Sequence, residues 1–206
     1  FSSTCAIFGD QVAPPIEEDA PKAPVNPYGE SKLAFEKALE WSRRVHGLNY
    51  FALRYFNACG ATKERGERHE PETHLIPLVL RAAAGLTDGI RIFGDDYPTP
   101  DGTCIRDYVH VLDLADAHIR AVEAPGEKSG CYNVGVGRGD SVREVIDAVR
   151  KATGKEFPVI VVPRRPGDPP ELVAANAKIR RELGWEPQHD IHSAVSSAWE
   201  FFQREL

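Results

Sequence analysis

The chain has 206 residues, of which 42% are hydrophobic, and a formal net charge of −6 at pH 7. This length and composition suffice for a normal buried core in one or two domains. Lysine and arginine are interspersed with aspartate and glutamate, so neither nucleic acid nor an anionic membrane is an expected partner. The longest apolar stretch, 75–86, contains Pro77 and Arg81 and is too short to cross a bilayer.

Cysteine and histidine spacing gives two further expectations. The four cysteines are far apart and form no CxxC pair, which indicates reduced thiols in a cytoplasmic protein. The seven histidines have no HxxxH or HExxH spacing, so no metal site is expected. The chain contains no methionine and begins Phe-Ser-Ser-Thr, so we expect it to be part of a longer protein.

The first predicted elements are a strand, a loop and a long helix. Residues 2–8 form a short apolar run typical of a buried strand, and 11–25 form a proline-rich loop. Asn26-Pro27 predicts the start of a helix at 27–46, and Gly47 predicts its end. The helix is expected to bury one apolar face, made of Ala34, Phe35, Ala38, Leu39, Trp41 and Val45.

Strands and helices alternate through the rest of the chain. Strands are predicted at 50–56, 90–93, 132–135 and 159–162, and helices at 75–85, 109–123, 141–153 and the C-terminal end. This alternation predicts an α/β fold with a parallel sheet.

Tyr28 and Lys32 are the residue pair best suited to chemistry. Four positions apart on a helix, their side chains point within about 40° of each other. An ammonium about 5 Å from a phenolate stabilises it by roughly 3 kcal/mol at an effective dielectric of about 20. Tyr28 could then accept a hydroxyl proton while hydride leaves the same carbon, with Thr4 or Ser3 bonded to that hydroxyl. A YxxxK pair also occurs by chance at solvated helix starts, so other segments must support this interpretation.

Four segments, one of which contains the Tyr28–Lys32 pair, occur in a specific order. They are Phe1-Ser2-Ser3-Thr4, Pro27-Tyr28-Gly29-Glu30-Ser31-Lys32, Leu53-Arg54-Tyr55-Phe56-Asn57 and the run from Ile92 to Val111, IFGDDYPTPDGTCIRDYVHV. Over essentially the whole chain, the set resembles the extended short-chain dehydrogenase/reductases, and among them the UDP-glucose 4-epimerases.

This resemblance implies a fold of two parts. One is a partial Rossmann domain, a doubly wound parallel sheet, in 1–60 and 105–137. The other is a smaller α/β nucleotide-sugar-binding domain in 61–104 and 138–206. Family members are often dimers through helices beside the YxxxK helix, so a homodimer is expected by analogy.

The resemblance also implies a site around a UDP-sugar and NAD. Tyr28 takes the place of the catalytic base, Lys32 of its partner and Thr4 of the catalytic Ser/Thr. The implied cofactor-binding residues are Ser2, Ser3, Tyr28, Lys32, Tyr55 and Phe56. The implied substrate-binding residues are Thr4, Asn57, His74, Leu75, Arg91, Ile92, Phe93, Arg106, Arg165, Asp168 and Leu172.

Individual substrate roles follow from the same resemblance. Arg106 and Arg165 would clamp the diphosphate, for which guanidinium geometry is suited. A surface ion pair is the alternative for each, but the apolar Cys104-Ile105 before Arg106 speaks against it there. Asp168 would bind a ribose hydroxyl, and Leu172 would take the position of a size gate for the sugar. His74 occupies a position where the family usually has asparagine, which puts that contact in doubt.

One family feature is missing from the chain. The segment Gly135-Val136-Gly137-Arg138-Gly139 lacks the third glycine of GxGxxG and the acidic residue about 20 positions later, so it is expected to be only a turn. The cofactor's glycine-rich turn would lie in a missing N-terminal part. The 206 residues alone are therefore expected to bind NAD weakly or not at all and to be inactive.

The reaction implied is NAD-dependent 4-epimerisation of a UDP-hexose through a 4-keto intermediate. Related 4,6-dehydratases, and usually the sugar-acid decarboxylases, carry an acidic residue where this chain has Cys5 and Ala6, so epimerisation fits better. Two alternatives stay open. The first is an epimerase of another UDP-sugar (a pentose, a uronate or an N-acetylhexosamine), and the second is an inactive fragment that only binds nucleotide sugar.

Overall fold

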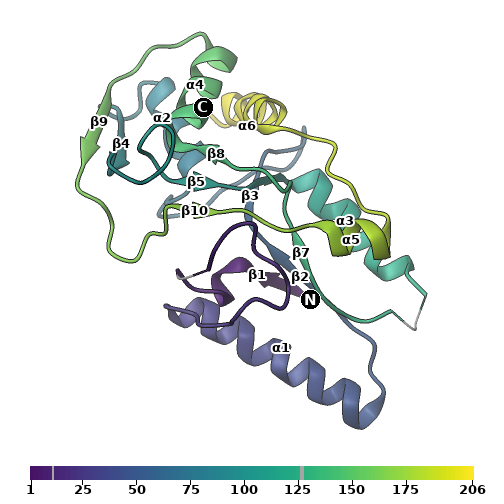
Figure 1. Ribbon diagram of the computed structural model, residues 1–206. Coiled ribbons are helices and arrows are strands. Elements are labelled where there is room, and N and C mark those ends of the chain that lie inside the picture. The colour runs from purple at the N-terminus through teal and green to yellow at the C-terminus, as the bar shows by residue number, and fades with distance from the viewer. Residues whose placement is uncertain (11, 126–127) are drawn as a thin grey trace.

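The N-terminal sheet consists of three parallel strands (Figure 1). The computed structural model describes residues 1–10, 12–125 and 128–206, so residue 11 of the predicted 11–25 loop lies outside the described residues. The strands are β1 (Ser2–Thr4), β2 (Phe51–Tyr55) and β7 (Gly130–Val134), in the order β1-β2-β7. Parallel pairing needs crossover connections, and a helix lies between successive strands in each case.

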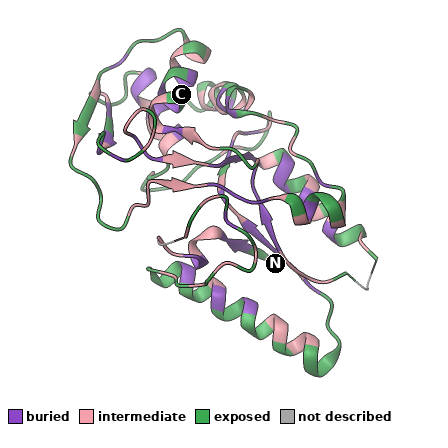
Figure 2. Cartoon of the chain, in the orientation of Figure 1, coloured by how far each residue is buried: buried purple, intermediate pink, exposed green. Residues whose placement is uncertain are grey.

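Helix α1 (Pro27–His46) begins and ends as predicted, but it buries a different face. The Asn26 side chain caps its first turn by accepting from the Gly29 amide at 2.8 Å, and Gly47 ends it with φ 70°. The predicted apolar face is wrong, since Phe35 and Trp41 are 51% and 63% exposed. Much of α1 is exposed along its length (Figure 2). The helix buries Gly29, Leu33 and Glu36 instead. Glu36 can lie inside the protein because it forms an ion pair with Arg54 of β2.

A second core gathers elements from the middle and the end of the chain. Strands β4 (Ile90–Phe93) and β9 (Val159–Val162) pair in parallel. Three helices pack together beside them: α2 (Leu75–Ala83), α4 (Val142–Thr153) and α6 (Ile191–Glu205). Ser141 caps α4 as predicted, in a reciprocal capping box with Glu144.

Short strands that periodicity cannot predict connect the two parts. They are β3 (Asn57–Cys59) with β6 (Tyr108–His110), and β5 (Ile105–Arg106) between β10 (Glu171–Leu172) and β8 (Asp140–Ser141). The strand predicted at 2–8 ends at Thr4, where a 3-10 turn, η1 (Cys5–Ile7), follows. Helix α3 (Val111–Glu123) starts two residues later than predicted, because β6 pairs with β3 up to His110.

The last helix before α6 lies in the first part of the molecule. Helix α5 (Ala177–Leu183) and Trp185 pack in one core with α3, β2 and β7, although the sequence places 138–206 in the second domain. The α/β class with mainly parallel pairing is confirmed. Within the described residues, no helix combines the length and apolar character needed to cross a membrane.

Candidate active site

The start of α1 lies against the end of β1, which brings Tyr28, Lys32 and Thr4 to one edge of the sheet. A Cβ on Gly29 would lie 2.5 Å from the Ala6 carbonyl oxygen, so only glycine lets α1 approach η1 this closely. The Lys32 Nζ donates to the Ser2 carbonyl at 2.9 Å and lies 5.7 Å from the centre of the Tyr28 ring. The ring of Tyr28 is exposed, so an incoming molecule can reach its hydroxyl.

The hydroxyl of Tyr55 extends this polar edge. It lies 2.9 Å from the Ser2 Oγ and also hydrogen-bonds the His118 Nε2 from α3. Desolvation raises the pKa of Tyr55, which keeps the phenol protonated near neutral pH. Ser2, Tyr28, Lys32 and Tyr55 therefore share one surface.

Ser3 and Phe56, two other residues of the predicted cofactor site, lie inside the protein. Ser3 Oγ donates to Glu36 Oε1 at 2.5 Å, and the ring of Phe56 packs with Leu33 and Ile7. Both lie beneath the polar edge formed by Ser2, Tyr28, Lys32 and Tyr55, and their contact with a cofactor stays a prediction.

A buried ion pair underlies the same edge. Glu36 on α1 accepts two hydrogen bonds from Arg54 on β2, at 3.0 and 2.7 Å, and Arg54 also donates to the Glu18 carbonyl at 2.8 Å. Burial disfavours the charged form of Glu36, but the hydrogen bonds and charge of Arg54 outweigh burial and lower the pKa of the carboxyl. The pair ties α1 to the sheet at the level of Ser3.

A second group of predicted residues gathers around Arg106. Its Nη2 lies 2.5 Å from an oxygen of Asp168, and Leu172 stands directly opposite it in the β5–β10 pair. The guanidinium of Arg165 stacks 3.8 Å above the ring of Phe93. Arg106, Asp168 and Leu172 thus lie together on or beside β5 and β10, and Arg165 from the 163–170 loop lies on Phe93 at the end of β4.

The two groups adjoin each other. Desolvation raises the pKa of Cys5, the residue after Thr4, to about 12. Arg106 lies close enough to Cys5 for its positive charge to oppose this rise. Leu172 packs against the cluster that contains Phe56. Asn57 bridges toward β6 by donating from its amide nitrogen to the Asp107 carbonyl at 3.2 Å.

The other predicted substrate residues lie at the β4 strand and at α2. Arg91 is exposed on β4, whereas Ile92 is buried in the second core. His74 precedes Leu75, the first residue of α2, and its Nδ1 lies 2.5 Å from a Glu67 oxygen.

Asp107 is a key residue that the sequence did not single out. Its carboxylate accepts from the backbone amides of Val136, Gly137 and Ala174 at 2.7, 2.9 and 3.2 Å. A Cβ on Gly135 would lie 2.6 Å from Asp107 Oδ2, which explains the glycine there. The glycine-rich segment is a turn, as predicted. Asp107, whose role was not predicted, binds it to the strand that carries Arg106.

Burial sets the expected titration of Asp107. Desolvation is the largest effect and raises its pKa from 3.8 to about 6, although the three amides oppose it. A raised pKa in the folded state means that the free energy of unfolding falls as pH rises from about 4 to about 6. In carbon-13 NMR, the Asp107 carboxyl resonance is identified as the one that disappears in the Asp107→Asn variant. In the unmodified protein this resonance should titrate with a midpoint near pH 6. Asp96 is the control, because Arg164 lowers its pKa; an Asp107 midpoint below 4 would contradict the assignment.

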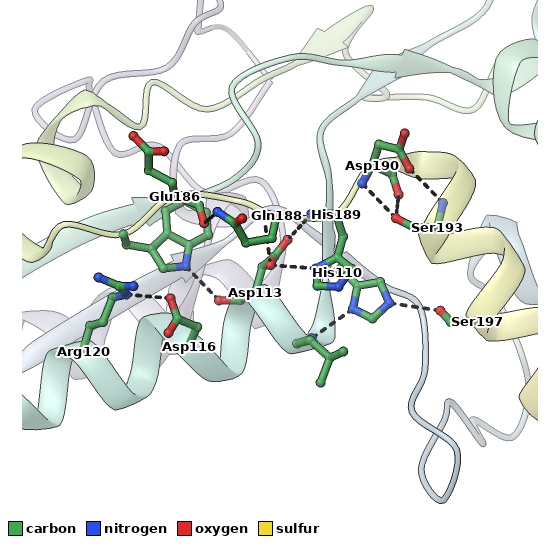
Figure 3. A network of polar contacts seen from close by, with 12 residues as sticks. His110, Asp113, Asp116, Arg120, Glu186, Gln188, His189, Asp190, Ser193 and Ser197 are labelled. Carbon is green, nitrogen blue, oxygen red and sulfur yellow. Dashed lines mark hydrogen bonds and ion pairs between the residues drawn. The ribbon is translucent and has the colours of Figure 1, made fainter.

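A second missed residue, Asp113, joins three elements (Figure 3). Its carboxylate accepts from the backbone amides of Gln188 and His189, both at 3.1 Å, and from the His189 Nδ1 at 2.8 Å. The ring of His189 stacks on His110, whose Nε2 lies 3.0 Å from the Ser197 Oγ on α6. This network connects α3 in the first part to α6 in the second.

Comparison with known proteins gives the family. Residues 1–135 match the NAD dependent epimerase/dehydratase family. A UDP-glucose 4-epimerase from Lacticaseibacillus casei is 50% identical over 208 residues, covering 98% of this chain and 63% of the relative. A crystal structure of UDP-glucose 4-epimerase, 48% identical, matches with a TM-score of 0.95 over 100% of this chain and 64% of its own.

The Bifidobacterium longum UDP-glucose 4-epimerase was solved in complex with NAD+ and UDP. It is 38% identical and matches with a TM-score of 0.92, over 99% of this chain and 63% of its own. The chain thus spans somewhat less than two thirds of the length of these relatives, and the predicted Rossmann-type α/β fold is confirmed. With more than half of its residues matching the family and half identical to a curated member, this chain belongs to the NAD-dependent epimerase/dehydratase family.

Proposed function

We propose that this chain forms the catalytic and nucleotide-sugar-binding part of a UDP-glucose 4-epimerase. The observation that carries the proposal is the ammonium of Lys32, which lies beside the ring of Tyr28 and on the Ser2 carbonyl of β1, two residues before Thr4. The 50% identity with the Lacticaseibacillus casei epimerase supports the choice of reaction.

In this proposal, Tyr28, Lys32 and Thr4 together move one proton. The phenolate of Tyr28, stabilised by the nearby Lys32 charge, accepts the proton of the sugar 4-hydroxyl. The Thr4 hydroxyl hydrogen-bonds the same oxygen. When bound, NAD would accept the hydride from C4 and return it to the other face of the resulting 4-keto sugar.

The polar atoms of the exposed Ser2 and Tyr28 and of the half-buried Lys32 fit the ribose hydroxyls of NAD. The outer edge of β1 has no partner strand in the described chain, and the relatives are longer than this chain. We propose that an N-terminal segment outside this chain pairs there and supplies the remaining cofactor site. The 206 residues alone would then be inactive.

UDP would be held by the second group of residues. Arg106 and Arg165 supply two guanidinium groups for the diphosphate, and Asp168 beside Arg106 supplies a carboxylate for a ribose hydroxyl. Asn57 and the 91–93 strand complete the nucleotide site in this proposal. Leu172, opposite Arg106, would then lie at the sugar.

A panel of UDP-sugars tests the function. The longer protein that contains this chain is incubated with UDP-glucose, UDP-N-acetylglucosamine, a UDP-pentose and a UDP-uronate, and products are identified by chromatography and NMR. UDP-galactose from UDP-glucose is the expected main product, and this chain alone should yield none. A faster reaction with another UDP-sugar would change the assigned substrate. Bound nicotinamide without turnover of any UDP-sugar would contradict the epimerase assignment and leave nucleotide-sugar binding as the function.

A second copy of the chain is the proposed partner of α1. Ala34, Ala38, Trp41 and Val45 are exposed at spacings of 4, 3 and 4 residues, which forms a continuous apolar stripe along the helix. We expect the longer protein to sediment as a dimer and its Trp41→Glu variant as a monomer in analytical ultracentrifugation. Val122→Glu is the control, because Val122 is an exposed apolar residue on α3. A dimer that persists in Trp41→Glu would exclude this stripe as the interface.

A further inference from the structure

Four side chains converge in the segment between β3 and α2. One ligand atom from each of Glu67, His69, Glu72 and His74 lies within 4.8 Å of the other three. The His74 Nδ1 lies 2.5 Å from a Glu67 oxygen and 3.1 Å from a Glu72 oxygen. The ring centres of His69 and His74 are 5.3 Å apart.

Hydrogen bonding among these groups leaves negative charge unsatisfied. A neutral imidazole offers at most one hydrogen at the His74 Nδ1, yet Glu67 and Glu72 both converge on that nitrogen. The two carboxylates supply the negative charge of the cluster, and neither lysine nor arginine is among its four members. A divalent cation would balance this charge and leave every ligand atom with a partner.

Glu72 is held in position before any ion arrives. Its side chain is only 7% exposed, and its Oε1 accepts from the backbone amides of Thr73 and His74, both at 2.7 Å. All hydrogen bonds found for Glu72 among the described residues use Oε1, which leaves Oε2 for a further partner. The other three side chains are more exposed and can rotate toward a common centre.

We propose that Glu67, His69, Glu72 and His74 form a binding site for a divalent cation of the zinc class. Two imidazole nitrogens and two carboxylate oxygens are a ligand set that zinc takes in tetrahedral sites. Imidazole ligands disfavour calcium and magnesium, which prefer oxygen. Tetrahedral ligands about 2.0–2.1 Å from zinc lie roughly 3.4 Å apart, so rotation of the exposed side chains closes the observed spread.

The sequence patterns HxxxH and HExxH cannot identify this set. Its members follow one another at spacings of 2, 3 and 2 residues, and they meet because the loop turns back just before α2 begins at Leu75. A cation there would fasten the 67–74 segment to the start of α2. The site stands on these residues alone and does not depend on the proposed epimerase activity.

Metal titration of the longer, untagged protein tests the site. The protein is treated with a chelator, freed of it, and titrated with zinc against a chromophoric chelator, with no nucleotide sugar present. One zinc per chain is expected. His69→Ala and, separately, Glu67→Gln should each weaken binding at least tenfold, whereas His46→Ala, which changes an exposed histidine at the end of α1, should not.

Circular dichroism on each variant confirms that it is folded, and Glu67→Gln keeps the size and polarity of the side chain. Absence of stoichiometric zinc binding would overturn the proposal. So would equal affinity in wild type and both variants, or calcium binding as tight as zinc binding. Because no sugar is turned over in this experiment, its result is independent of the panel of UDP-sugars.

Discussion

Replacing Tyr28 with phenylalanine is expected to lower turnover of UDP-glucose by the longer protein about 10³-fold, the usual effect of losing a general base. Affinity for UDP should stay within a factor of about two, because the proposed UDP contacts around Arg106 lie on other elements. Initial rates give kcat, and calorimetry with UDP gives the affinity.

Tyr50→Phe is the matched control for the loss of a phenol. The Tyr50 hydroxyl donates to Glu40 on α1, away from the exposed ring of Tyr28 and the end of β1. This variant should keep its turnover. Unchanged turnover in Tyr28→Phe would refute the assignment of the base, and a parallel loss of UDP affinity would indicate a structural role instead.

Replacing Arg54 with methionine is expected to lower the free energy of unfolding by about 3–5 kcal/mol, because it leaves a buried carboxylate without its partner. Arg54 and Glu36 are 3% and 4% exposed, so water cannot substitute for the lost hydrogen bonds. The pKa of Glu36 is lowered in the folded protein, so its stabilising contribution is present above about pH 4.5 and is lost as pH falls. Urea unfolding followed by circular dichroism measures the change.

Arg44→Met is the control for this pair. Arg44 and Glu40 form an ion pair of similar length, 2.8 Å, on the exposed side of α1, where solvent screening leaves such pairs little effect on stability. The double variant Arg54→Met/Glu36→Leu should recover part of the lost stability, because it no longer buries a lone charge. Equal losses in Arg54→Met and Arg44→Met would contradict the buried-pair interpretation.

The two parts of the molecule depend on contacts that are far apart in sequence. Asp107 and Asp113 each connect segments separated by about 30 to 80 positions: Asp107 reaches Val136 and Ala174, and Asp113 reaches His189. Local sequence patterns do not identify such distant partners. The same holds for the short strands β5, β8 and β10, whose two residues each are too few for any periodicity.

The sequence by itself determined the α/β class, the boundaries of α1 and α4 with their caps, and the family, because these rest on local propensities and on motifs of adjacent residues. Only the tertiary structure decided which face of α1 is buried. A charged Glu36 enters the core because Arg54 on the neighbouring strand compensates its charge, while Phe35 and Trp41 stay at the surface. The tertiary structure likewise brings Glu67 and His74 together, because the path of the backbone between two residues decides whether their side chains meet.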